Sequence, residues 1–194
     1  MPLELQAGSD EPGLVARSLG QDHEAFGQLV DRYSPIIVNL AYRMVGDRTD
    51  AEDLAQEAFI TAFKALPTFR ADAKFSTWLY RIAANKCKDW LRTRRPGQLD
   101  LDSVPDEHLA ENRTPEKLLS QQQVADQLDR AIRRLPPLYR EAFVLKHVEG
   151  LSYEEMEEIL GVNGDTLKMR VYKGRVQLTR ELAEFNDSRS SVSR

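Results

Sequence analysis

The chain has 194 residues, of which 41% are hydrophobic and 30% charged, a balance that suits a globular protein rather than a disordered one. This length allows one large domain or two small ones. The net charge of −4 argues against a free-standing DNA-binding protein, because such proteins are usually basic. The charges are unevenly placed, however, and their distribution is more informative than their sum.

Several classes of protein are disfavoured by what the sequence lacks. It has no run of about 18 apolar residues, so we expect no membrane insertion. Its first residues lack the basic and apolar regions of a signal peptide, which predicts a cytoplasmic protein. Cys87 is the only cysteine, and His23, His108 and His147 are far apart, so we expect neither a disulfide nor a metal site. We also find no phosphate-binding loop or nucleophile–base pair, so we expect no catalytic residues and no cofactor.

The periodic segments have helical spacing, which predicts an all-α fold. Helices are expected at about 26–44, 50–66, 75–95, 123–135, 138–148, 152–160 and 166–185, with Pro35 kinking or splitting the first. The proline-containing, acidic segment between the third and fourth favours a flexible linker. We therefore expect a flexible tail (1–19), a helical domain (20–96), an acidic linker (97–121), a second helical domain ending in a helix-turn-helix (122–185) and a second flexible tail (186–194).

The expected helix at 50–66 has one unusual feature on its polar face. Its other face is apolar, and Phe63 belongs to that apolar arc. Ile60 lies alone within the polar arc. This pattern fits either an ordinary solvated face or a protein-docking face with one apolar anchor and an acidic rim. The residues of this candidate docking face are Asp50, Asp53, Gln56, Glu57, Ile60 and Lys64.

The expected helix at 75–95 carries a polar stripe at spacings of three and four residues: Trp78, Arg81, Asn85, Lys88 and Arg92. Segment 69–95 holds eight Lys or Arg against two Asp. Such cations can bind phosphates, and an exposed Trp can stack on an unpaired base. The alternative is a solvated basic face with Trp78 tucked into the core.

Near the C-terminus, two short expected helices are joined by a turn containing Gly161. Ser152 and Glu155 have the spacing of a capping box, and Asn163 is a candidate N-cap for the following helix. This arrangement is typical of a helix-turn-helix, in which the second helix enters the DNA major groove. A generic helical hairpin is the alternative. The acidic residues at 154–158 would repel phosphates, so we expect them to point away from DNA.

The order of these features resembles a known family. The run Asp50 to Phe59 resembles the polymerase-binding helix of sigma region 2. Phe75 to Asn85 resembles the promoter-melting helix that follows it. Leu135-Pro136-Pro137 and Leu151 through Arg175 resemble sigma region 4. The chain is therefore similar to sigma factors of the extracytoplasmic-function (ECF) group, over residues 20–185.

The resemblance implies a function in transcription initiation, with the β′ clamp and β flap of bacterial core RNA polymerase, promoter DNA and an anti-sigma factor as partners. It assigns reading and melting of the −10 element to Arg70, Asp72, Lys74, Phe75, Trp78, Arg81, Asn85, Lys88 and Arg92. It assigns reading of the −35 duplex to Thr166, Lys168, Met169, Arg170, Tyr172, Lys173 and Arg175.

Two other hypotheses remain at this point. A polymerase-independent helix-turn-helix regulator would use only the C-terminal domain, and would leave the docking face and the Trp78 stripe unexplained. An enzyme would need a catalytic constellation that the sequence does not show. The charge distribution adds a further hypothesis, that the acidic linker shields the basic DNA-reading faces in the free protein.

Overall fold

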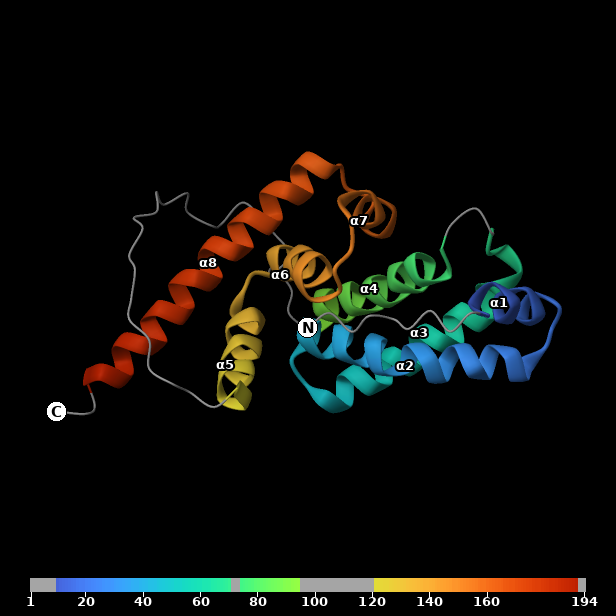
Figure 1. Cartoon of the computed structure of the whole chain (residues 1–194), viewed down its shortest axis with the longest axis horizontal. Coiled ribbons are helices and arrows are strands. Elements are labelled where there is room, and N and C mark those ends of the chain that lie inside the picture. Colours follow the sequence, from blue (N-terminus) through green and yellow to red (C-terminus); the bar gives the residue numbers. More distant parts are fainter. Residues whose placement is uncertain (1–9, 71–73, 95–120, 192–194) are drawn as a thin grey trace.

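The structure is a computed structural model that describes residues 10–70, 74–94 and 121–191 (Figure 1). All regular structure within these ranges is helical, which confirms the all-α prediction. The helices are α1 (Glu11–Leu19), α2 (His23–Val45), α3 (Arg48–Ala65), the 3-10 turn η1 (Leu66–Thr68), α4 (Phe75–Arg94), α5 (Gln121–Arg134), α6 (Pro137–Phe143), the π-helical turn η3 (Val144–Val148), α7 (Tyr153–Leu160) and α8 (Gly164–Ser191).

The N-terminal domain consists of α1 to α4 packed around one apolar core. Asp22 caps α2 by accepting a hydrogen bond from the Ala25 amide at 3.0 Å. Gly46 ends α2 with a left-handed φ of 89°, a conformation that glycine adopts without strain. Between these ends α2 is continuous through Pro35, so the expected split of this helix does not occur.

The prediction of a flexible tail over 1–19 is wrong for residues 11–19, which form α1. This helix buries Leu14 and Val15 against the core, and Glu11 accepts a 2.6 Å hydrogen bond from the Tyr33 hydroxyl. These contacts stabilise a helix too short to form alone. At the other end, α8 continues to Ser191, so the segment 186–191 is also helical rather than a flexible tail.

The C-terminal domain consists of α5 to α8 and has the predicted helix-turn-helix. Ser152 and Glu155 form both hydrogen bonds of the capping box at the start of α7. Gly161 ends α7 with a φ of 66°, and Asn163 caps α8 by accepting from the Thr166 amide at 2.9 Å. Gly174 is buried where α8 passes α6, and a Cβ atom there would lie 3.2 Å from the Tyr139 carbonyl oxygen.

The two domains are in contact. Helix α7 packs on α4, and α2 packs on α5 and α6 (Figure 1). The buried Arg140 side chain crosses this interface, where it donates hydrogen bonds to the carbonyl oxygens of Met44 in the N-terminal domain and Leu135 in its own. The expected acidic linker, 97–121, lies outside the described residues except for Gln121. Its proposed shielding of the basic faces therefore stays a prediction.

Candidate functional site

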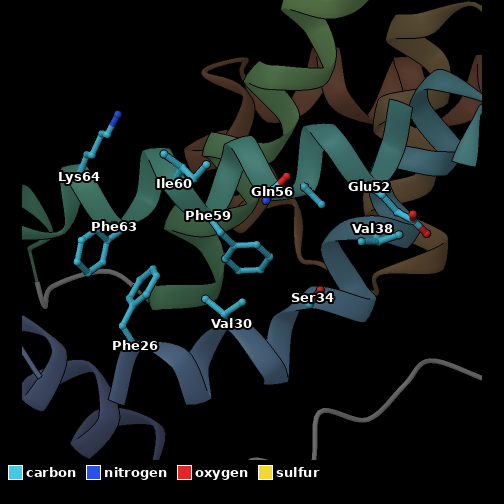
Figure 2. Close-up of a pocket in the computed structure, with 11 residues that line it drawn as sticks. Phe26, Val30, Ser34, Val38, Glu52, Gln56, Phe59, Ile60, Phe63 and Lys64 are labelled. Carbon is cyan, nitrogen blue, oxygen red and sulfur yellow. The ribbon is translucent and has the colours of Figure 1, made fainter. Parts of the chain in front are cut away.

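An apolar groove of about 490 Å³ lies between α2 and α3. Figure 2 shows the rings of Phe26, Phe59 and Phe63 in the space between the two helices, with Ile60 above them on α3. Phe26 and Phe63 meet edge to face, with ring centroids 5.1 Å apart. The groove is therefore built from aromatic residues on both helices and is open to a partner.

Two large apolar side chains of α3 are exposed at this groove. Ile60 is 49% exposed, as its isolated position in the polar arc indicated. Phe63 is 43% exposed, although it belongs to the apolar arc of the helix. Phe26 and His23 contact this ring, but they belong to the first turns of α2 and cover only part of it. The candidate docking face is consequently more apolar than the sequence pattern indicated.

The other predicted docking residues surround the groove unevenly. Gln56 and Lys64 line it together with Ile60 (Figure 2), as does Glu52, which the sequence interpretation did not include. Asp53 is exposed beside them. Two residues are engaged elsewhere within the domain: Glu57 pairs with Lys86 at 3.2 Å, and Asp50 lies 3.7 Å from Arg94.

The residues of the predicted stripe on α4 differ in exposure. Arg81, Asn85 and Arg92 are exposed on one face, and Arg92 forms an ion pair with Asp89 at 3.0 Å. Trp78 is half-buried, with its ring 5.1 Å from that of Phe69. One part of the Trp78 ring packs on Phe69 and Phe75, and another part stays accessible. Trp78 is therefore neither fully exposed for stacking nor fully tucked into the core.

The remaining predicted −10 residues differ in accessibility. Arg70 is exposed, whereas Phe75 is buried in the aromatic cluster. Asp72 lies outside the described residues. Lys74 forms a 2.7 Å ion pair with Glu155 of α7, and Lys88 lies 3.6 Å from Glu141 of α6. Glu155 therefore points at the segment expected to bind DNA, although the acidic face of α7 was expected to point away from it.

Tyr80 is a buried residue of α4 that the sequence analysis did not select. Its hydroxyl donates a 2.8 Å hydrogen bond to Glu149 of the C-terminal domain. Burial is the main cause that raises the pKa of both Tyr80 and Glu149. Burial also raises the pKa of Glu141, which is only 3% exposed, although the charges of Lys88 and Arg170 oppose that rise. A buried acid, Glu141, and a half-buried acid, Glu149, thus lie where the domains meet.

The outer face of α8 is more accessible. Met169 and Tyr172 are 53% and 51% exposed, and Lys168 and Arg175 are exposed beside them. Among the other predicted −35 residues, Thr166, Arg170 and Lys173 are half-buried. The inward residues of this helix are Leu167, Val171 and Leu178, as predicted. The second helix of the helix-turn-helix therefore carries an exposed face with two basic and two large side chains, as expected of a helix that binds the major groove.

Other site types have less support in the described part of the chain. Within it, no group of three or more His, Cys, Asp and Glu side chains could hold a metal ion. None of the described helices is long and apolar enough to span a membrane. Cys87 is buried in the core, and burial raises its thiol pKa to about 12. A thiol with that pKa is a poor nucleophile at neutral pH.

Comparison with known proteins identifies relatives of both domains. The family model Sigma-70 region 2 matches residues 29–96, and the model Sigma-70, region 4 matches residues 125–178. The ECF RNA polymerase sigma factor SigW of Bacillus subtilis is 38% identical over 172 residues, covering 84% of this chain and 92% of SigW. The ECF RNA polymerase sigma-E factor of Escherichia coli is 38% identical over 170 residues, covering 84% of this chain and 88% of the relative.

Two solved structures are also similar. The structure of CnrH in complex with the cytosolic domain of CnrY has a TM-score of 0.67 at 26% identity, covering 88% of this chain and 96% of that one. The sigma factor RpoE in complex with the anti-sigma factor NepR from Bartonella quintana has a TM-score of 0.63 at 27% identity, covering 81% and 96% of the two chains.

Proposed function

The chain belongs to the sigma-70 family as an ECF-type sigma factor acting in transcription initiation, and from this premise we propose how its surfaces divide that function. The groove between α2 and α3 binds the β′ clamp of core RNA polymerase. The exposed face of α4 and the segment before it bind the −10 element, and the outer face of α8 binds the −35 duplex. The C-terminal domain also contacts the β flap.

The exposure of Ile60 and Phe63 beside an aromatic groove carries the docking proposal. Apolar side chains that are exposed in the free protein and fill a pocket in a complex typically contribute most of the binding free energy. Asp53 places negative charge near these two residues and favours a partner segment with basic residues, whereas Glu52 is already paired with Arg48 at 2.7 Å. A polymerase-independent regulator would have no use for such a surface.

The DNA-binding proposal rests on the chemistry of α4 and α8. On α4, Arg81 and Asn85 can form hydrogen bonds to base edges, and the accessible part of Trp78 can stack on an unpaired base. On α8, Met169 and Tyr172 lie where a recognition helix contacts the major groove. We further propose that an anti-sigma factor inhibits the protein by covering the α2–α3 groove, and that the protein acts with polymerase in the cytoplasm.

The docking proposal is tested by Ile60→Asp. This substitution places a charge at the centre of the proposed contact, and loss of such an anchor typically costs about 2 kcal/mol, or roughly 30-fold in affinity for core polymerase. Gln28→Asp makes the same kind of change at an exposed position of α2 that does not line the groove. Titration of both variants into core polymerase should separate them. Equal affinities would show that the groove is not the docking surface.

A further inference from the structure

The first turn of α8 carries an acid on the face that we assign to the −35 duplex. Asp165 is the second residue of α8, and its side chain is 96% exposed. At about 100° per residue along a helix, Asp165 lies within about 40° of Met169 and Tyr172. The buried Leu167 is on the opposite side of the helix. Asp165 therefore belongs to the outer face of α8, at the end where the helix begins.

Stabilisation of the helix end does not account for this acid. An acid in the first turn commonly caps a helix or interacts with its dipole. Here Asn163 makes the capping hydrogen bond, accepting from the Thr166 amide at 2.9 Å. A carboxylate of α7 also lies against the start of α8, because a Cβ atom on Gly164 would be 2.6 Å from Glu157 Oε1. The start of α8 thus has a cap and a nearby negative charge without Asp165.

The charge of Asp165 is partly offset by a neighbouring cation. Lys168, three residues further along α8, donates a 3.1 Å hydrogen bond to Asp165 Oδ1. A carboxylate has about four lone-pair sites on its two oxygens, so Asp165 can accept a further hydrogen bond while it is paired. The exposed Arg175 lies further along the same helix. The outer face of α8 therefore changes from acidic at its beginning to basic beyond Tyr172.

An exposed carboxylate at this position distinguishes bases by their major-groove edges. The first residues of the second helix of a helix-turn-helix contact base edges. Guanine presents only acceptors there, and thymine presents an acceptor and a methyl group. Adenine presents an amino donor beside an acceptor nitrogen, whereas cytosine presents the N4 amino donor alone. An ionised carboxylate only accepts hydrogen bonds, so cytosine is the base that matches it without a repulsive neighbour.

We propose that Asp165 is a specificity-determining residue that accepts a hydrogen bond from the N4 amino group of a cytosine in the −35 duplex. This inference rests on the proposed binding of that duplex by the outer face of α8. It goes further because it names the base and the atom that one side chain reads. It also assigns a function to an acid on a surface whose other charged residues, Lys168 and Arg175, are basic.

The proposed contact gives affinity and selectivity different dependences on the acid. With cytosine opposite it, the Asp165 carboxylate gains a hydrogen bond. With guanine or thymine opposite it, the carboxylate faces an acceptor and repels it. Loss of the acid should therefore weaken binding to duplexes that have the cytosine and strengthen binding to those that lack it. A carboxylate that only repelled phosphates would weaken binding to every duplex equally, because phosphates carry no sequence information.

Selection of duplexes from a random pool tests the inference, with the full-length protein bound to core RNA polymerase. The wild-type protein should enrich cytosine at one position of the selected duplexes. Asp165→Ala should lose that preference by about fivefold or more, the lower end of the discrimination that a base contact provides. Asp165→Asn should select adenine at the same position, because an amide can donate to and accept from the adenine edge.

Glu154 provides the matched control. It is an exposed acid and the second residue of α7, as Asp165 is the second residue of α8. Glu154→Ala and Glu154→Gln thus remove the same charge from the same position of the neighbouring helix, and they should keep the wild-type base profile. An unaltered profile in both Asp165 variants would overturn the inference. A gain in affinity for all duplexes alike in Asp165→Ala would overturn it too, because the acid would then act on phosphates alone.

Arg175→Ala separates failure of this inference from failure of the proposed function. Unchanged retention of duplexes by Arg175→Ala would contradict binding of the −35 duplex by α8, and the inference would fail with it. Weakened retention by Arg175→Ala, together with a wild-type profile in the Asp165 variants, would overturn the base contact alone. Thermal unfolding is measured for each variant. Should Asp165→Ala be destabilised, Asp165→Asn decides the question, since a switch from cytosine to adenine requires a folded α8.

Discussion

The two proposed DNA-reading faces differ in how available they are. On α8, Met169 and Tyr172 are more than half exposed, and the face around them is accessible. On α4, Trp78 is half-buried and Lys88 faces an acid of the other domain. The proposed duplex-reading face is therefore accessible, whereas the proposed strand-reading face is partly occupied.

This difference matches the order of events that a promoter requires. A duplex is present before polymerase arrives, so a face that reads it can be preformed. Unpaired bases exist only after melting, and a face that captures them is best exposed at that stage. The comparison indicates that the N-terminal domain is the restrained part of the protein, and the following predictions test this asymmetry.

The largest expected effect concerns melting. Trp78→Ala and Asn85→Ala should each reduce open-complex formation by about 5- to 150-fold, because a lost stacking or base-edge contact costs about 1–3 kcal/mol. Binding of a −35 duplex should be unchanged. Permanganate footprinting of the melted bases measures the effect, and thermal unfolding controls for the packing of Trp78 on Phe69. Normal melting in both variants would contradict the proposal that α4 reads the unpaired strand.

A smaller effect is expected in sequence preference on α8. Met169→Ala should change the preference at one −35 base by about fivefold, since loss of an apolar contact to a base costs about 1 kcal/mol. The stability of the fold should not change, because this side chain is mostly exposed. Sequencing of the duplexes that the protein selects from a random pool gives the base profile. An unaltered profile would show that Met169 does not contact bases.

Phosphate contacts of α8 should produce a uniform effect. Arg175→Ala should weaken binding equally across sequences and lower the slope of log affinity against log salt by about 1. Lys168→Ala should have a weaker effect, because the Lys168 ammonium group already pairs with Asp165 at 3.1 Å. Salt titrations of both variants on two unrelated duplexes measure this. A sequence-dependent loss for Arg175→Ala would instead indicate base readout.

The smallest expected effect is the pH dependence of the contact between the two domains. Burial raises the pKa of Glu141 and Glu149 when the two domains are in contact. Protonation of these two acids therefore favours the contact. This stabilisation is lost as the pH rises through the raised pKa. Glu155 acts in the opposite sense, because its ionised form stabilises the contact through Lys74. Its pKa is lowered, so this stabilisation is lost only at more acidic pH. As the pH falls from 7.5 to 5.5, the equilibrium should therefore shift toward the state in which the two domains are in contact.

Small-angle scattering over this pH range measures the radius of gyration, which falls as more molecules have the two domains in contact. Glu149→Ala should flatten the profile, because it removes one of the two acids whose pKa is raised. An increase in radius on acidification would contradict the sign derived from the pKa shifts.

The local features of the fold were predictable because they depend on residues close in sequence. The Ser152–Glu155 capping box and the Asn163 cap each require only side chains within one helical turn. Ile60 was identified for a similar reason, since an apolar residue among polar neighbours is visible from helical periodicity alone. The resemblance to sigma factors also followed from motifs within single helices.

The errors have a different cause. Periodicity places Phe63 on the apolar side of α3 but does not show how much of that side α2 covers. Helix α1 was missed because its short apolar surface is stabilised by tertiary contacts, including the Tyr33–Glu11 hydrogen bond. The contacts between domains depend on residues far apart in the chain. Glu141, an acid next to the apolar run that begins at Ala142, was the one signal that could have indicated a buried cationic partner.

The close approach at Gly174 has a mechanical consequence for promoter selection. This residue lies about 15 Å along α8 from its start, at 1.5 Å per residue, and the helix crosses α6 there with no side chain between them. The part of α8 between its start and this crossing point carries Met169 and Tyr172. A side chain at Gly174 would force a displacement of a few tenths of an ångström and change the direction of this segment of α8 relative to α6. The orientation of the proposed −35-reading face thus depends on Gly174, which is itself buried against α6.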